Sequence, residues 1–336
     1  MCEVSSKVKQ KRILVVTLGG TIAMTHDASG AIVPSLSAQE LVKAVPGLSE
    51  LARISTCSPL QMPGASLTLE HLFEVSQLIE RELKADADGA VVVQGTDTIE
   101  ETAFVLDCLL ATDLPVVVTG AMRGAEAAGA DGPANLRASA IVAASDIGGL
   151  GALVVLNDEV HAARFVRKGH TGLASSFVSE PSGPIGVVLE DRFRFLQRPD
   201  PLPRIAAPPA GRVPPVALLQ VGMGDDGRLV SALRDLGYEG AVIAAMGAGH
   251  VPEELVAPLE ELAEQMPVVL STRVVAGPVF QRTYGFRGSE TDLLARGLLA
   301  GGMLGPLKGR LLLQLLLAHG ADQDKIQASF SALCSE

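Results

Sequence analysis

The sequence predicts an α/β protein with a larger N-terminal domain, built on a mostly parallel and doubly wound sheet, and a smaller C-terminal α/β domain. Short apolar runs alternate with helical patterns along the chain, which is typical of parallel sheets covered by helices. A single proline-rich stretch divides this alternation into two parts. The 336 residues are enough for two domains, and their 48% apolar content is that of a folded chain with a large core.

Strands are expected in the N-terminal domain where several apolar residues follow one another. These runs are 13–17, 89–94, 115–119, 151–156 and 185–189. Apolar residues at helical spacing lie between them, at 38–45, 68–84, 99–111 and 133–145. Pro133 fits the first turn of the last of these helices. The alternation favours a parallel sheet with helices on both faces.

The domain boundary is predicted at a segment rich in proline. Seven prolines lie within it: Pro199, Pro201, Pro203, Pro208, Pro209, Pro214 and Pro215. Such a stretch is typical of an extended linker. We therefore expect an N-terminal domain at 1–198, a linker at 199–212 and a C-terminal domain at 213–336. In the last, strands are predicted at 215–221, 240–246 and 267–272, and helices at 228–236, 253–265, 290–299 and 307–319.

The composition argues against several classes of function. A net charge of −11 disfavours a nucleic-acid-binding surface. No apolar run reaches the length of a membrane span. The apolar stretch after the polar segment Met1–Arg12 is too short for the core of a signal peptide. We expect a cytoplasmic protein that acts on a small molecule, without nucleic acid or a membrane as partner.

Cysteine and histidine give no sign of a metal site or a disulfide framework. Cys2, Cys57, Cys108 and Cys334 lack metal-ligand spacing and do not form a paired pattern. The six histidines contain no pair at metal-binding spacing. We expect neither a metal nor another cofactor.

The segment Gln94–Thr102 is the most informative part of the chain. It follows the apolar run Gly89–Val93 and leads into the helix predicted at 99–111. Thr96 and Asp97 therefore lie at the carboxyl end of a buried parallel strand, where open α/β sheets bind ligands. The positive end of the helix dipole also favours an anion there.

The start of this helix has its own signals. Thr98 and Glu101 have the spacing of a capping box, which would fix the first turn. Glu100 and Glu101 are expected to stabilise the helix N-terminus rather than to take part in chemistry. From local sequence alone, Asp97 fits a second helix cap as well as a ligand-binding carboxylate.

A second hydroxyl follows the first predicted strand. The run 13–17 leads into Leu18–Ala23, where Gly19 and Gly20 let the backbone turn tightly and approach a ligand closely. Thr21 then presents its hydroxyl at the end of that strand. Taken alone, Thr21 fits either a turn residue or a nucleophile.

Together these two segments resemble the bacterial-type L-asparaginase/glutaminase family. That family has a Gly-Gly-Thr-Ile-Ala motif after its first strand and a Gly-Thr-Asp-Thr-x-Glu-Glu-Thr motif later, and Gly19–Ala23 and Gly95–Thr102 match both. Further segments resemble the family at 119–123, 130–133, 156–168 and 307–313. The similarity thus covers nearly the whole chain.

The resemblance implies a role for each matching residue. Thr21 would be the nucleophile, Thr96 the second threonine, Asp97 its neighbouring acid and a ligand of the substrate ammonium, and Lys168 the base-side partner. Only the family register selects Lys168 over Arg167. The implied reaction converts L-asparagine and water to L-aspartate and ammonia through an acyl-threonine ester. L-Glutamine is a second candidate substrate, and a homo-oligomer, a dimer or tetramer, is implied.

The sequence departs from the family in the loop after the first motif. The family usually has a tyrosine there, whereas the two tyrosines of this chain, Tyr238 and Tyr284, lie elsewhere. Ala31 aligns with that tyrosine. Thr25 or Ser29 are the candidates for a replacement hydroxyl.

Two further departures concern substrate binding. Gly64 aligns with the serine that contacts the substrate α-carboxylate in the family, and Ser58 and Ser66 are nearby alternatives. Tyr284 replaces a glutamate that many relatives supply across a subunit interface. His250 aligns near another such position and is a candidate for a binding role, with a surface-loop histidine as the alternative.

Two other functions compete with catalysis on an amide. Residues 222–227, Gly-Met-Gly-Asp-Asp-Gly, form a dinucleotide fingerprint between a predicted strand and helix. Asp225 and Asp226 would repel a pyrophosphate in that turn, and the acid that binds the ribose is missing after 240–246. The other alternative is an amino-acid-binding protein of the same fold that does not catalyse turnover.

Overall fold

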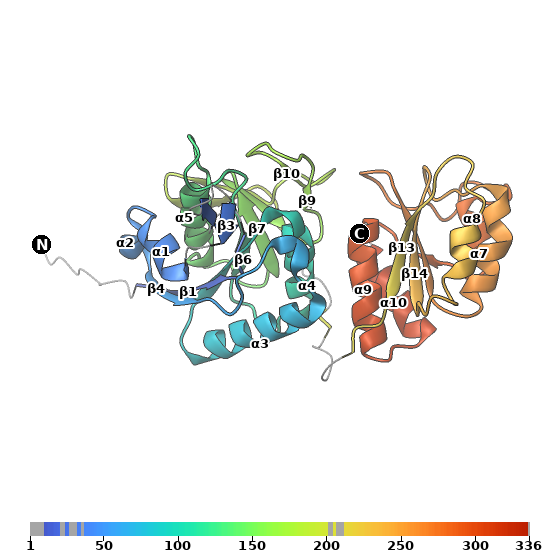
Figure 1. Cartoon of the computed structure of the whole chain (residues 1–336), viewed down its shortest axis with the longest axis horizontal. Coiled ribbons are helices and arrows are strands. Elements are labelled where there is room, and N and C mark those ends of the chain that lie inside the picture. The colour runs from blue at the N-terminus through green and yellow to red at the C-terminus, as the bar shows by residue number, and fades with distance from the viewer. Residues whose placement is uncertain are drawn as a thin grey trace, which may run out of the picture. The chain divides into compact units, whose positions relative to one another are not determined.

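The computed structural model describes residues 10–20, 24–26, 32–34, 37–200, 204–205 and 212–334. Backbone contacts divide the chain into two compact units, Met1–Pro201 and Leu202–Glu336 (Figure 1). The limits expected from sequence for the domains and for the linker between them stay predictions.

The first unit contains a mixed sheet of eight strands. Their order is β12 (Arg192–Phe195), β11 (Gly186–Leu189), β8 (Glu159–Ala162), β7 (Ala152–Leu156), β6 (Val116–Thr119), β5 (Gly89–Val93), β1 (Arg12–Thr17) and β4 (Arg53–Cys57). The five strands from β7 to β4 are parallel. The other three continue the sheet in antiparallel fashion.

Helices cover both faces of the parallel part. Ile13 and Val15 of β1 pack in the core beneath α1 (Ala38–Lys43), α2 (Leu48–Leu51) and α5 (Gly132–Ala143). Leu14 and Val16 face the opposite core, beneath α3 (Leu69–Ala85) and α4 (Ile99–Leu109). This alternation follows from the two-residue period of a strand. It explains why the central strands β1, β5, β6 and β7 are apolar along most of their length.

Smaller elements lie outside the main sheet. β2 (Met24–His26) pairs with β3 (Ile32–Pro34), and β9 (Arg167–Lys168) pairs with β10 (Phe177–Val178), each in antiparallel fashion. Two short 3₁₀ helices follow strands of the sheet: η2 (Gly64–Ser66) and η3 (Thr96–Thr98).

The order of the strands reverses between β1 and β5. The chain runs from β1 outward to β4 and then crosses back over β1, through α3, to β5. The sheet then grows in the other direction through β6 and β7. The carboxyl ends of β1 and β5 thus flank the topological switch point, where open α/β sheets bind their ligands.

The second unit is a smaller α/β layer structure with a fully parallel sheet. Its strands are β13 (Val216–Gln220), β14 (Gly240–Ala245), β15 (Val268–Thr272) and β16 (Leu299–Ala300). Its helices are α6 (Arg228–Ala232), η4 (Glu253–Leu255), α7 (Val256–Ala263), α8 (Glu290–Ala295), α9 (Pro306–Ala318) and α10 (Gln323–Cys334). Among the described residues, no helix is long and apolar enough to cross a membrane.

The structure confirms the predicted fold class and corrects several elements. The run 185–189 forms β11, which is antiparallel rather than parallel. The helix predicted at 290–299 ends at Ala295, because Gly297 adopts a φ of 96° and the chain then enters β16. The helix predicted at 228–236 ends at Ala232.

Buried His161 in β8 makes the stability of the first unit depend on pH. Its ring nitrogen Nδ1 lies 2.9 Å from Ser179 Oγ, and burial lowers the pKa of His161 from 6.5 to about 4. Between these values the unfolded chain binds a proton that the folded protein does not, so stability falls as the pH drops through this window. We expect the free energy of unfolding to fall by about 2 kcal/mol from pH 7.5 to pH 5.

Urea unfolding at several pH values measures this change. His161→Gln is expected to flatten the profile over the same interval, because glutamine has no titratable group at this buried position. An unchanged slope in the variant would show that another group is responsible.

Candidate active site

The turns after β1 and β5 are in direct backbone contact at the switch point. Gly20 has a φ of 92°, and a Cβ atom built on it would lie 2.0 Å from the amide nitrogen of Gly95. Only glycine fits such an approach. Thr21, the nucleophile expected from sequence, lies outside the described residues, as do Ala31 and Ser29.

Thr96 and Asp97 share one ammonium group. Lys168 Nζ donates to Thr96 Oγ1 at 2.9 Å and pairs with Asp97 Oδ1 at 2.7 Å. Thr96 is 7% exposed, whereas the side chains of Lys168 and Asp97 are 17% and 69% exposed. The ammonium is therefore held against a buried hydroxyl, and the carboxylate on its other side is open to solvent.

The β9–β10 hairpin brings Lys168 to this position. Lys168 stands opposite Phe177, which is buried in the core beneath α3 and α4, and its backbone N–H donates to Glu100 Oε1 at 3.2 Å. Successive residues of a strand point to opposite faces, so Arg167 and Lys168 cannot both point at Thr96. The contact is made by Lys168, the residue chosen by the family register.

The predicted capping box at Thr98 and Glu101 is wrong. The Thr98 side chain makes no capping hydrogen bond to α4. It instead donates to the carbonyl oxygen of Gly64 at 3.0 Å and accepts from Gln94 Nε2 at 3.1 Å. The Thr98 hydroxyl thus connects η2 to η3. In this position it satisfies both the Gln94 amide and the Gly64 carbonyl oxygen, which is more than a local helix cap would satisfy. The carboxylate of Asp97 contacts Lys168 rather than capping α4.

Gly64 lies close to the same turn. A Cβ atom at Gly64 would approach the carbonyl oxygen of Gly95 to 2.9 Å, so the structure brings Gly64 next to Gly95, the residue before Thr96. Of the alternative serines, Ser58 accepts from Thr17 Oγ1 at 2.9 Å at the end of β1. Ser66 is exposed at the end of η2.

Sequence reasoning missed the residues that hold the loop after β6. Asp131 accepts from the backbone N–H groups of Met122 and Arg123 at 2.9 and 2.8 Å. Asn135 Nδ2 donates to the carbonyl oxygen of Gly120 at 2.9 Å. A Cβ atom at Gly120 would lie 3.3 Å from Thr96 Cγ2, so this loop packs behind the hydroxyl-bearing turn. The spacing of Asp131 and Asn135, one helical turn apart, was the available signal.

In the second unit, His250 faces a buried carboxylate. His250 Nε2 lies 3.2 Å from Glu290 Oε2, and the Glu290 side chain is 0% exposed. Burial raises the pKa of Glu290, but hydrogen bonds from the backbone of Tyr284 and Thr283, together with His250, outweigh it and lower the pKa below its usual range. The Tyr284 ring packs edge to face against His250 at 4.8 Å.

The dinucleotide-like turn at 222–227 is lined by its own carboxylates. Asp226 forms an ion pair with Arg228 at 2.6 Å, and Asp225 accepts from the backbone N–H of Gly227 at 3.3 Å. These acids occupy the amide groups and the cation that a pyrophosphate would need.

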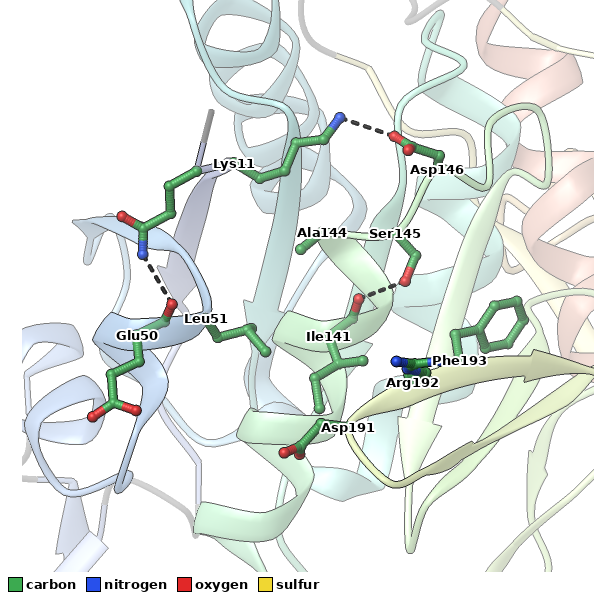
Figure 2. Close-up of a pocket in the computed structure, with 11 residues that line it drawn as sticks. Lys11, Glu50, Leu51, Ile141, Ala144, Ser145, Asp146, Asp191, Arg192 and Phe193 are labelled. Atoms are coloured by element: carbon green, nitrogen blue, oxygen red, sulfur yellow. Dashed lines mark hydrogen bonds and ion pairs between the residues drawn. The ribbon is translucent and has the colours of Figure 1, made fainter. Parts of the chain in front are cut away.

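A cavity of about 790 Å³ lies at the opposite edge of the first unit, near the amino end of β1 (Figure 2). Lys11 closes one side through an ion pair of 3.0 Å with Asp146, and Ser145 Oγ donates to the carbonyl oxygen of Ile141 at 2.7 Å. The Ser145 hydroxyl is therefore bonded within its own helix end, and the other residues that line the cavity carry no hydroxyl. The cavity thus lacks a contact between an amine and a hydroxyl like that of Lys168 with Thr96. Among the described residues, no group of three or more His, Cys, Asp or Glu side chains could hold a metal ion.

Comparison with known proteins identifies relatives over nearly the entire length. Residues 12–201 match the family model "Asparaginase, N-terminal", and residues 215–330 match "Glutaminase/Asparaginase C-terminal domain". An L-asparaginase of Bacillus licheniformis is 34% identical over 92% of this chain and 96% of its own. A probable L-asparaginase of Deinococcus radiodurans is 36% identical over 95% and 97%, respectively.

Solved structures show the same similarity. A probable cytoplasmic L-asparaginase from Campylobacter jejuni superposes with a TM-score of 0.88 at 30% sequence identity. The match covers 96% of this chain and 100% of that one.

Proposed function

We propose that this chain, which belongs to the asparaginase family, hydrolyses L-asparagine to L-aspartate and ammonia with the hydroxyl of Thr21 as its nucleophile. The single observation that carries the mechanism is the contact of Lys168 Nζ with Thr96 Oγ1 at 2.9 Å, beside Asp97. A buried hydroxyl, an amine and a carboxylate in contact are the groups needed to move a proton in acyl transfer.

In the first step Thr21 attacks the side-chain amide carbon of asparagine. The assignment of Thr21 as the nucleophile is supported by Gly20, the residue before it, whose backbone packs against Gly95, the residue before Thr96. A threonine hydroxyl is a weak nucleophile and needs a group that takes its proton. Attack gives a tetrahedral intermediate, the proton of the Thr21 hydroxyl passes to the amide nitrogen, and the C–N bond then breaks to release ammonia and leave an aspartyl ester on Thr21.

In the second step Thr96 positions and deprotonates the water that hydrolyses the ester. The Thr96 hydroxyl accepts a hydrogen bond from Lys168 Nζ, and it can relay the proton of the attacking water to the Lys168–Asp97 pair. Asp97 holds the amine in place throughout. Water attack regenerates the Thr21 hydroxyl and releases L-aspartate. Backbone N–H groups of the glycine turns would stabilise the oxyanion of each step.

The exposed carboxylate of Asp97 is proposed to bind the α-ammonium of the substrate as well. Its side chain is 69% exposed, and a charge-assisted hydrogen bond to an ammonium is a strong orienting contact. The substrate α-carboxylate is placed near Gly64, with Ser58 or Ser66 as the alternative donors. Since Gly64 has no side chain, its backbone N–H would be the donor at that position.

We also propose activity on L-glutamine, because no tyrosine closes the loop after the first motif. One extra methylene in a substrate is worth about 1–3 kcal/mol of discrimination at most, and least in a site that closes incompletely. We expect the kcat/KM values for L-asparagine and L-glutamine to differ by less than about tenfold. An ammonia-release assay on purified protein measures both.

The same assay tests the function itself. Absence of ammonia from either amide, together with binding of L-aspartate, would support a non-catalytic amino-acid-binding protein instead. A preference above a hundredfold for one amide would contradict the proposed breadth. Binding of NAD would support the dinucleotide alternative.

We further propose that the chain forms a homo-oligomer and that it is located in the cytoplasm. The family resemblance supports a homo-oligomer, a dimer or tetramer, which sedimentation velocity would measure. A cytoplasmic location is supported by the similarity to the probable cytoplasmic L-asparaginase of Campylobacter jejuni.

A further inference from the structure

Glu100 lies about one helical turn after Thr96 in the chain. It contacts the backbone of Lys168, whose side chain contacts Thr96. It is the second residue of α4, and its carboxylate was expected to stabilise the helix N-terminus. Glu100 does lie in the first turn of α4, and the structure also brings its Oε1 within 3.2 Å of the backbone nitrogen of Lys168. The two residues are 68 positions apart, so this contact joins α4 to β9.

Lys168 is therefore held at both ends by one short segment. Thr96 and Asp97 accept from its ammonium at 2.9 and 2.7 Å, and Glu100 accepts from its backbone N–H at 3.2 Å. All three acceptors belong to η3 and the first turn of α4. A lysine side chain has many rotamers, and fixing its backbone against the same segment restricts those that reach Thr96.

Contacts on either side of Lys168 also fix the strand that carries it, since Val166 is buried in the core and the backbone N–H of Gly169 donates to the carbonyl oxygen of Ser176 at 2.6 Å. β9 contains two residues and pairs with the two residues of β10. Two paired residues alone fix the distance between the β9 backbone and α4 only weakly. A hydrogen bond to an ionised carboxylate is roughly twice as strong as a neutral one, so Glu100 adds a direct restraint between α4 and the backbone of Lys168.

We infer that Glu100 is a positioning residue for amide hydrolysis, which sets the backbone of Lys168 so that its ammonium meets Thr96. The inference rests on the proposed function, because it acts through Lys168 and Thr96. Glu100 has no contact with the reacting atoms in this mechanism. Its removal should lower the rate of the chemical step and leave substrate binding by Asp97 nearly intact.

The test compares Glu100→Ala and Glu100→Gln with Glu70→Ala. Glu70 is the matched control, since it is an exposed glutamate at the second position of α3. We expect Glu100→Ala to lower kcat for L-asparagine by roughly tenfold to a hundredfold, the cost of a displacement of about 1 Å at a reacting group. KM should change by less than about threefold. Glu100→Gln keeps an acceptor oxygen and should recover most of kcat, and Glu70→Ala should match the wild type.

A double-mutant cycle shows whether Glu100 acts through Lys168. In a Lys168→Met background, the Glu100→Ala change should lower kcat by less than about twofold, because the group that it positions is already gone. Rates are expressed per folded protein, from thermal unfolding of each variant. An equal loss in both backgrounds would overturn the inference, as would an Ala variant within twofold of the wild type.

These outcomes are distinct from a failure of the proposed function. If the wild type released no ammonia, or Lys168→Met retained full kcat while Arg167→Met lost it, the assigned mechanism would fail before the role of Glu100 was reached. An active wild type with an inactive Lys168→Met variant, and no effect of Glu100→Ala, would reject the positioning role alone.

Discussion

Thr21→Ala is expected to lower kcat for L-asparagine hydrolysis by at least about a thousandfold, because the variant has no hydroxyl to form the ester. The residual rate should come from substrate binding and oxyanion stabilisation, which do not depend on the nucleophile. Affinity for L-aspartate is expected to stay within about threefold of the wild-type value, since the truncated methyl and hydroxyl are not the groups that hold the substrate termini.

Steady-state ammonia release and calorimetric titration with L-aspartate measure the two effects of this substitution. The titration is the control, because it shows that the site remains folded. Wild-type turnover in Thr21→Ala would remove Thr21 from the mechanism and leave Thr96 as the first candidate nucleophile.

Thr96→Val is expected to lower kcat by roughly a hundredfold to ten-thousandfold, the range of a lost general acid–base group. Valine has nearly the shape of threonine, so Gly120, which packs near Thr96 Cγ2, keeps its neighbour. Lys168 Nζ loses one acceptor and retains Asp97. The effect should therefore fall on the rate of chemistry and not on folding.

Thr112→Val is a matched control for Thr96→Val. Thr112 lies between α4 and β6, and its hydroxyl accepts from the backbone N–H of Leu114. Its loss should leave kcat unchanged. Equal rates in the wild type and Thr96→Val, under conditions where the chemical step limits turnover, would contradict the assigned role.

The parts of the fold that were predictable from sequence are those built on apolar runs. β1, β5, β6 and β7 are buried on both faces and lie where the runs predicted them. β4 was missed because it lies at the sheet edge and has few buried positions, so Arg53–Cys57 shows no such run. Edge strands have little need of the continuous apolar pattern.

The antiparallel part of the sheet was missed for another reason. The turn between β7 and β8 contains Asn157 and Asp158, both with positive φ of 52° and 61°. Such a pair is typical of a two-residue hairpin, and it was available in the sequence. The following strand, β8, contains Glu159 and His161, whose polarity hid it.

The site was predictable only in part from local pattern. The turn at Thr96 was found because hydroxyls follow a buried strand, and the structure brings Gly20 and Gly64 to the same turn. Lys168 lies 72 residues from Thr96, and no spacing rule connects such positions. The contact of Glu100 with the Lys168 backbone also depends on how the β9–β10 hairpin meets α4, which is a property of the tertiary structure.

The proposed mechanism requires the hydroxyls of Thr21 and Thr96 to face each other across one pocket that holds the substrate side chain. A crystal structure of the protein with L-aspartate bound measures this directly. We expect the side-chain carboxylate of aspartate to lie about 3 Å from both hydroxyl oxygens, with its ammonium at Asp97. Aspartate bound elsewhere, or Thr21 and Thr96 opening onto separate surfaces, would contradict the account.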